Sequence, residues 1–242
     1  MATPTLTPER TGRLRPTVQV GPPPFNPGDH LSRAEFERLY EAHPEIKKAE
    51  LIEGVVYMPS PAHAETHGRP HNTVNTWLGV YAAATPGTYA YDNATVRLDM
   101  ENEVQPDVLL RLGARYGGRS RVTSDDYLAG APELVIEVAA SSWAYDLHSK
   151  RHVYARNGVQ EYLVVQPLEQ RVDWFALREG VYETLTPDAH GVLRSEVFPG
   201  LWLQPAALWS GDLAGMLATL QEGVASAEHA AFVNRLATAG VE

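Results

Sequence analysis

The sequence of 242 residues contains no cysteine. A disulfide framework, a thiolate zinc site and a cysteine nucleophile are therefore all excluded. The sequence also lacks any apolar run close to the roughly 20 residues that span a bilayer. No basic start followed by an apolar stretch, which would mark a secretory signal, lies near Met1. We therefore expect a cytoplasmic protein that has no membrane partner.

Positive charge is scarce as well, since 20 Lys and Arg residues stand against 30 Asp and Glu residues and give a formal net charge of −10. Broad passive binding to nucleic acid needs clustered basic residues, so this balance argues against it. It does not exclude an enzyme that meets a phosphate through a metal ion held by carboxylates. The content of 44% hydrophobic and 21% charged residues is typical of globular proteins.

The chain divides into an N-terminal tail and one predicted α/β domain. Residues 1–29 hold seven prolines and few large apolar side chains, so we expect a disordered tail or an extended strap. Residues 30–242 form the predicted domain, whose middle has the order helix, three strands, helix, strand. The predicted helices are 32–42, 70–84, 143–157 and one from 206 onward; the predicted strands are a hairpin at 50–58, then 89–98, 104–112, 134–139 and 162–165, and a hairpin of 172–177 with 181–186.

Two acidic residues in the predicted strands are candidates for chemistry. Glu137 lies inside the apolar run Leu134–Ala139, where an acid is costly unless a partner compensates it. The partner could be a basic residue, a second carboxylate that shares a proton, or a divalent cation. Asp107 follows Pro106 at the start of another strand, and two carboxylates of this kind suit Mg²⁺ or Mn²⁺. A structural ion pair is the alternative interpretation of Glu137.

Lys150 and Glu50 are further candidates. Lys150 lies four residues after Asp146 on a predicted helix, so a surface ion pair is the simplest interpretation. Because this helix follows the Glu137 strand, it could instead aim Lys150 at the acidic site, where an ammonium would stabilise charge on a phosphoryl group. Glu50, in the first hairpin, could be another acidic ligand or a solvated residue.

The most concentrated basic stretch of the predicted domain lies in the long connection 113–132 and just before it. Arg111, Arg115, Arg119 and Arg121 fall within eleven residues that contain no acid. This stretch could be a mobile loop that grips the phosphates of DNA, or a solvated linker.

Three histidines are regularly spaced before and within the predicted helix 70–84. His63, His67 and His71 recur every four residues, which on a helix would suggest zinc. Pro61, Gly68 and Pro70 interrupt that pattern, so we expect neither a continuous helix nor a zinc site there. His67 is a candidate for contact with phosphate or water, with a solvated loop position as the alternative.

Five segments, taken in order, resemble the Uma-type family of restriction-endonuclease-like proteins, which is part of the PD-(D/E)XK nuclease superfamily. The resemblance covers about Leu31 to Leu208. The segments are ELIEG at 50–54, VQPDV at 104–108, PELVIEV at 132–138, the stretch from Tyr145 through Lys150 to Tyr162, and FPGL at 198–201.

The resemblance implies a restriction-endonuclease-like core with a mixed sheet, flanked by an N-terminal helix and hairpin and a C-terminal hairpin and helix. It also implies that Asp107 and Glu137 hold a divalent metal. The superfamily usually places a lysine two residues after the second acid, where this sequence has Ala139. The family resembles this chain in moving that lysine to the following helix, which corresponds to Lys150, and Glu50 matches an early acidic position.

We therefore expect a Mg²⁺- or Mn²⁺-dependent endonuclease that hydrolyses phosphodiester bonds in DNA. Glu50 would be a further ligand or general base. One alternative is a binding or regulatory module that keeps the nuclease fold without turnover, and another is a hydrolase of other phosphodiesters. A homodimer is the expected assembly, because two sites related by a two-fold axis cut both strands of a duplex most simply.

Overall fold

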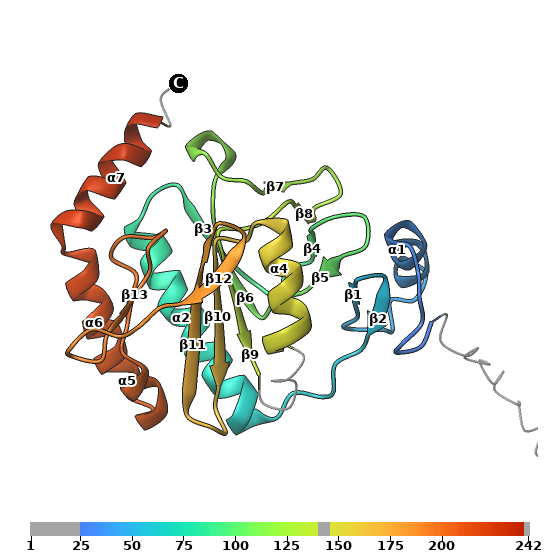
Figure 1. Ribbon diagram of the computed structural model, residues 1–242, viewed down its shortest axis with the longest axis horizontal. Coiled ribbons are helices and arrows are strands. Elements are labelled where there is room, and N and C mark those ends of the chain that lie inside the picture. Colours follow the sequence, from blue (N-terminus) through green and yellow to red (C-terminus); the bar gives the residue numbers. More distant parts are fainter. Residues whose placement is uncertain (1–24, 140–145, 240–242) are drawn as a thin grey trace, which may run out of the picture.

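The computed structural model describes residues 25–139 and 146–239, which form a mixed α/β fold around a six-stranded central sheet (Figure 1). The strand order is β12-β11-β10-β9-β6-β3, in which β9 and β10 are parallel and the other neighbours are antiparallel. This confirms the predicted mixed sheet. The strands are β3 Thr88–Asp92, β6 Val108–Leu112, β9 Leu134–Val138, β10 Glu161–Gln166, β11 Arg171–Arg178 and β12 Val181–Thr184.

The two faces of β9 meet different layers, because side chains alternate along a strand. Leu134 and Ile136 pack with α2 and the C-terminal helices, whereas Val135 and Ala139 pack on the side of α4. Figure 1 shows α2 and α4 on opposite sides of the central sheet. By the same alternation Glu137 faces α4. The helices are α2 Arg69–Ala84, α4 Arg151–Asn157, α5 Pro205–Ser210, α6 Leu213–Val224 and α7 Ala227–Ala239.

A second sheet lies on the α4 side, with the strand order β2-β1-β5-β4-β8-β7. Ile52, Val96 and Val104 from this sheet share a core with the α4 face of the central sheet. The helix α1 (Arg33–Glu41) lies beside the β1–β2 hairpin in Figure 1. The strands are β1 Glu50–Ile52, β2 Val55–Tyr57, β4 Val96–Arg97, β5 Glu103–Val104, β7 Arg121–Val122 and β8 Leu128–Ala129.

The predicted strands 89–98 and 104–112 each divide between the two sheets, which the sequence pattern missed. The first breaks at Asn93, whose φ of 50° lies in the left-handed region and turns the chain. The second breaks at Pro106, which has no N–H to continue a ladder. The predicted connection 113–132 also contains structure, namely the short helical turn η2 (Ala114–Tyr116), β7 and β8.

The prediction that Gly68 and Pro70 prevent a continuous helix is wrong. A wide helical turn, η1 (Ala64–Gly68), leads directly into α2, and Gly68 itself is helical (φ −59°, ψ −42°). In the wide turn the N–H groups of both His67 and Gly68 donate to the carbonyl of His63. Pro70 falls in the first turn of α2, where its missing N–H removes no helical hydrogen bond.

Both ends of the chain are only partly described. The predicted tail lies mostly in residues 1–24, outside the described residues, as does the start of the predicted helix at Trp143. Phe25 is buried and its ring lies 5.4 Å from that of Phe36 on α1.

The predicted helix 143–157 is observed as a wide turn η3 (Asp146–Lys150) followed by α4, which ends at Gly158 in the left-handed conformation.

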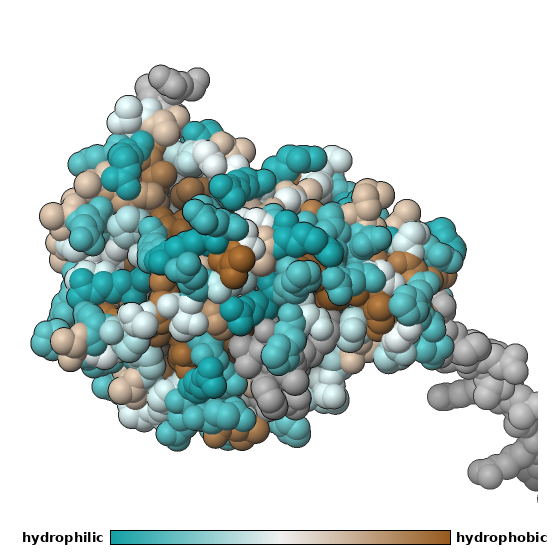
Figure 2. Space-filling model, viewed as in Figure 1, coloured by the Kyte–Doolittle hydropathy of each residue, from teal (hydrophilic) through white to brown (hydrophobic). Residues whose placement is uncertain are grey.

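The C-terminal part after β12 packs on the α2 side. A two-stranded sheet of β13 (Leu193–Arg194) and β14 (Trp202–Leu203) precedes the three C-terminal helices. Among the described residues, no helix combines the length and the apolar character needed to cross a bilayer. Figure 2 shows hydrophilic residues over most of one face, with hydrophobic ones scattered among them.

Glu161 ties this C-terminal part to the central sheet. Its carboxylate is fully buried at the start of β10 and accepts hydrogen bonds from Ser195 Oγ (2.7 Å) and from the backbone N–H groups of Glu196 (2.6 Å) and Val197 (3.2 Å). Burial raises the pKa of Glu161 to about 7, and the hydrogen bonds offset only part of that effect.

We expect this carboxyl to make stability depend on pH. Folding raises its pKa from an ordinary value of 4.5 to about 7. Its contribution to the unfolding free energy is therefore complete below pH 4.5 and is lost as the pH rises through 7. Between pH 5 and 8, the unfolding free energy of wild type should therefore fall on the order of 3 kcal/mol further than that of Glu161→Gln. Urea unfolding at both pH values measures this. The exposed Glu169→Gln control should keep the wild-type decrease, and an equal decrease in the Glu161 variant would contradict the assignment.

Candidate active site

Asp107 and Glu137 lie opposite each other on neighbouring strands. The antiparallel register of β6 and β9 pairs Val108 with Ile136, and one further step places Asp107 opposite Glu137. Opposite residues of an antiparallel pair point to the same face. Both side chains are nearly buried, and the N–H of Val138 donates to Asp107 Oδ2 (2.8 Å). The structure therefore brings together the two acids that the sequence selected.

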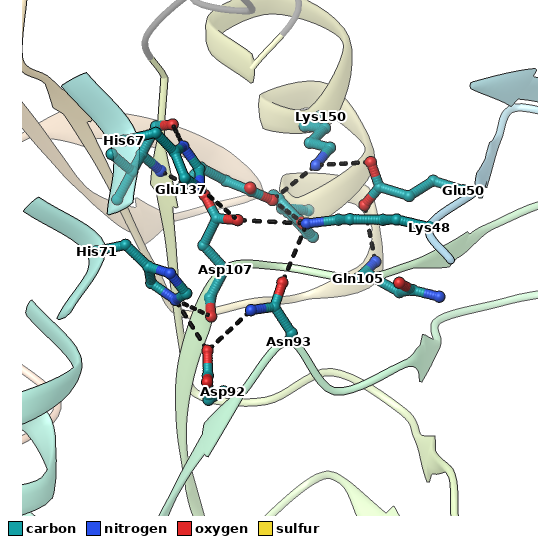
Figure 3. Close-up of polar contacts among 12 residues, drawn as sticks. Lys48, Glu50, His67, His71, Asp92, Asn93, Gln105, Asp107, Glu137 and Lys150 are labelled. Carbon is teal, nitrogen blue, oxygen red and sulfur yellow. Dashed lines mark hydrogen bonds and ion pairs between the residues drawn. The ribbon is translucent and has the colours of Figure 1, made fainter. Parts of the chain in front are cut away.

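Lys150 joins Glu137 to Glu50. Its Nζ lies 2.8 Å from Glu137 Oε1 and 3.0 Å from Glu50 Oε2 (Figure 3). All three side chains are 5% exposed or less. Tyr154, one helical turn after Lys150, donates its hydroxyl to Glu137 Oε1 at 2.9 Å. The displaced lysine of the predicted site thus contacts Glu137, one of the two acids predicted to hold the metal.

Glu50 comes from the second sheet, so the site lies where the two sheets meet. Glu50 begins β1, and its Oε1 accepts the backbone N–H of Gln105 at 2.7 Å. This bond fixes one carboxylate oxygen and leaves the other directed at Lys150. Glu50 is therefore a buried member of the site rather than a solvated turn residue.

Lys48 is a second lysine in the site, which the sequence reasoning missed. Its Nζ lies 3.3 Å from Asp107 Oδ1 and 3.2 Å from Asn93 Oδ1. Lys48 precedes Glu50 by two residues, and this spacing puts both side chains on the same side of extended backbone. The alternation could have revealed Lys48 once Glu50 was suspected, whereas Asn93 carries no signal in the sequence.

Two histidines border the other side of Asp107. His67, on η1, contacts the Val138 carbonyl through Nδ1 (3.0 Å), and its Nε2 lies 3.7 Å from Asp107 Oδ1. His71, on α2, lies with Nε2 3.0 Å from the Asp107 carbonyl and 2.8 Å from Asp92 Oδ1. The structure therefore places His67 beside the acidic pair, on a helical turn rather than a loop.

The charges around Asp107 keep it ionised. Burial alone would raise its pKa, but Lys48, His67, the Val138 N–H and Lys150 together hold the pKa below its usual range. Burial would lower the pKa of Lys48, but Asp107, Glu50 and Glu137 hold it above its usual range. The site thus contains a nearly buried carboxylate in its charged form, which a metal ligand must be.

The donor chemistry of Asp107 and Glu137 fits a divalent cation. Both offer hard carboxylate oxygens, which Mg²⁺ and Mn²⁺ prefer. Among the described residues, however, no three acidic or histidine side chains are gathered closely enough to hold a metal ion as they stand. Figure 3 shows the ammonium groups of Lys150 and Lys48 in contact with these carboxylates.

The predicted basic stretch does not join this site. Arg111 lies near the far end of β6 from Asp107, and its guanidinium is buried, with Nε and Nη2 donating to the hydroxyl and carbonyl of Ser120. Arg119 donates to the carbonyl of Gly158. Arg115 lies over the ring of Tyr116, and Arg121 is exposed on β7. The geometry of Arg111 gives it a structural role, in contrast to the predicted mobile phosphate grip.

Residues 33–206 match the model of the Uma2 family, described as "Putative restriction endonuclease". The fold resembles the crystal structure of a protein from Anabaena variabilis described as a "putative nuclease belonging to DUF820", with a TM-score of 0.56 and 19% identity. The match covers 74% of this chain and 98% of that one. No curated protein matches the sequence.

We expect Lys150→Met to destabilise the protein strongly. The substitution leaves two nearly buried carboxylates, Glu50 and Glu137, without their shared cation, and breaking a buried pair in this way costs about 3–5 kcal/mol. Urea unfolding at neutral pH without metal measures the loss. Adding Glu50→Gln to Lys150→Met should restore part of it.

The matched control is Lys47→Met, which removes the same charge from an exposed lysine that donates to the Pro44 carbonyl. Its unfolding free energy should stay within about 0.5 kcal/mol of wild type. Equal stability of the Lys150 and Lys47 variants would show that Lys150 does not compensate the two acids.

Proposed function

Since the chain belongs to the Uma2 family, whose model matches residues 33–206, we propose that it is an endonuclease that hydrolyses phosphodiester bonds in DNA with the help of Mg²⁺ or Mn²⁺. The observation that carries the proposal is the placement of Asp107 opposite Glu137, with the Lys150 ammonium on Glu137. Carboxylates beside a lysine are the groups that metal-assisted phosphoryl transfer uses.

Asp107 and Glu137 are the residues that would hold the metal ion. When bound, it would polarise the scissile phosphate and supply hydroxide at neutral pH. The N–H of Val138 fixes Asp107 through Oδ2, which leaves Oδ1 directed toward the site. Tyr154 and Lys150 fix Glu137 through Oε1.

Lys150 and Glu50 have supporting roles in the proposal. Lys150 would stabilise negative charge that develops on the phosphate or orient the attacking water. Glu50 would accept a proton from that water or act as a further ligand. Its orientation is already set by the Gln105 N–H.

DNA as the substrate follows from the family description and not from a basic surface. The net charge of −10 gives little general attraction for a polyanion. Contact with the phosphates would therefore depend on the site itself, where His67 and Lys48 lie beside the proposed metal ligand Asp107.

We also propose a homodimer, which would release linear plasmid directly, whereas a single site would accumulate nicked circles.

We expect the wild type to cleave supercoiled plasmid or single-stranded DNA with Mg²⁺ or Mn²⁺, and Asp107→Asn to lower the rate at least about 100-fold. The substitution keeps the size of the side chain and removes its charge. Agarose gels of time courses measure the rates. Glu169→Gln, an exposed acid on the turn after β10, should cleave as the wild type does.

Cleavage that survives in Asp107→Asn would overturn this site. Absence of cleavage by the wild type on any nucleic acid would favour a binding or regulatory module. Activity on small phosphodiesters alone would favour a hydrolase of another substrate.

A further inference from the structure

The two lysines of the site are held in different ways. Lys150 is 4% exposed, and its Nζ makes contacts of 2.8 and 3.0 Å with two carboxylates. Lys48 is 27% exposed, and its Nζ makes contacts of 3.3 and 3.2 Å with Asp107 and Asn93. Charge-assisted hydrogen bonds are usually about 2.7–2.9 Å long. Lys150 is therefore fixed inside the protein, whereas Lys48 is held loosely at its edge.

Lys48 contacts the one oxygen of Asp107 that points into the site. Oδ2 is already bound to the Val138 N–H at 2.8 Å. Oδ1 faces Lys48 at 3.3 Å and His67 at 3.7 Å. Oδ1 is therefore the oxygen directed toward the site for a cation that binds Asp107, and Lys48 contacts this same oxygen.

The balance of charge explains why a lysine lies there. Glu50, Asp107 and Glu137 bring three negative charges into a nearly buried region, and Lys48 and Lys150 bring two positive ones. Without Lys48, Asp107 would be a nearly buried carboxylate that has lost its ammonium contact, which is costly. Once a divalent ion compensates Asp107, that need disappears. The flexible four-carbon stem of Lys48 then allows its ammonium to move toward solvent.

We propose that Lys48 is a place-holding cation, which neutralises Asp107 in the metal-free protein and which a divalent ion must displace from Oδ1. The inference rests on the proposed function, because it takes Asp107 as a metal ligand. Lys48 thereby stabilises the empty site and weakens metal binding. It sets the concentration of metal at which the site fills.

The test is the affinity of the purified protein for Mn²⁺ without DNA, measured by isothermal titration calorimetry. Lys48→Met should bind Mn²⁺ about tenfold more tightly than wild type, which corresponds to 1.4 kcal/mol. Lys48→Arg, which keeps the charge, should bind as wild type does. Damage to the fold would weaken metal binding, so a gain in affinity cannot arise from misfolding.

Lys47→Met is the matched control, since it removes the same charge one residue away from an exposed side chain that contacts the Pro44 carbonyl. Its affinity should stay near that of wild type, and an equal gain in both variants would reduce the effect to net charge and overturn the proposal. Unchanged or weaker binding by Lys48→Met would also overturn it.

Asp107→Asn separates this inference from the proposed function. If it abolishes Mn²⁺ binding in the wild-type and Lys48→Met backgrounds alike, the gain acts through Asp107, as proposed. If it abolishes binding but Lys48→Met shows no gain, only the role of Lys48 fails. If Asp107→Asn leaves binding unchanged, or if neither the wild type nor Lys48→Met binds Mn²⁺, the metal site fails and the role of Lys48 with it.

Discussion

The Lys150 ammonium between Glu137 and Glu50 is the interaction on which the arrangement of the site depends. It joins the central sheet to the second sheet through the end of η3, directly before α4, since Glu137, Glu50 and Lys150 each come from a different layer. Buried charges persist only where they are paired and hydrogen-bonded. Tyr154 donates a further hydrogen bond to Glu137, and the Gln105 N–H donates one to Glu50. The position of α4 is thus set by charge as well as by the apolar contacts of Val153.

The order of the core elements could be predicted from the sequence, but their distribution between two sheets could not. The buried strands β9 and β10 read as continuous apolar runs, which is typical of strands covered on both faces. The break at Asn93 depends on its left-handed conformation. Asn tolerates that conformation, but an Asn in the sequence does not by itself predict it. The helix through Gly68 and Pro70 depends on a wide turn that no local pattern indicates.

The site was predictable to the extent that its residues break a local rule. Glu137 stands out because it interrupts an apolar strand, and burial with a lysine partner is the physical solution that the structure adopts. Lys48 and Tyr154 do not stand out in this way, because a lysine in an extended segment and a tyrosine in a helix are both ordinary. Only the fold brings Lys48 to Asp107 and Tyr154 to Glu137. The density of basic residues did not indicate the site, because the buried Arg111 guanidinium donates its hydrogen bonds to Ser120.

The excess of acid over the whole chain and the pairing of charges within the site have one common consequence. A polyanion approaching this protein meets a net charge of −10, so attraction must come from the few cations that reach solvent near Asp107. Lys150 is too deeply buried to be one of them, whereas Lys48 and His67 are partly exposed. Lys150 therefore mainly neutralises the internal acids Glu50 and Glu137. First contact of the site with a phosphate depends on the residues at its edge and on any metal that Asp107 and Glu137 hold.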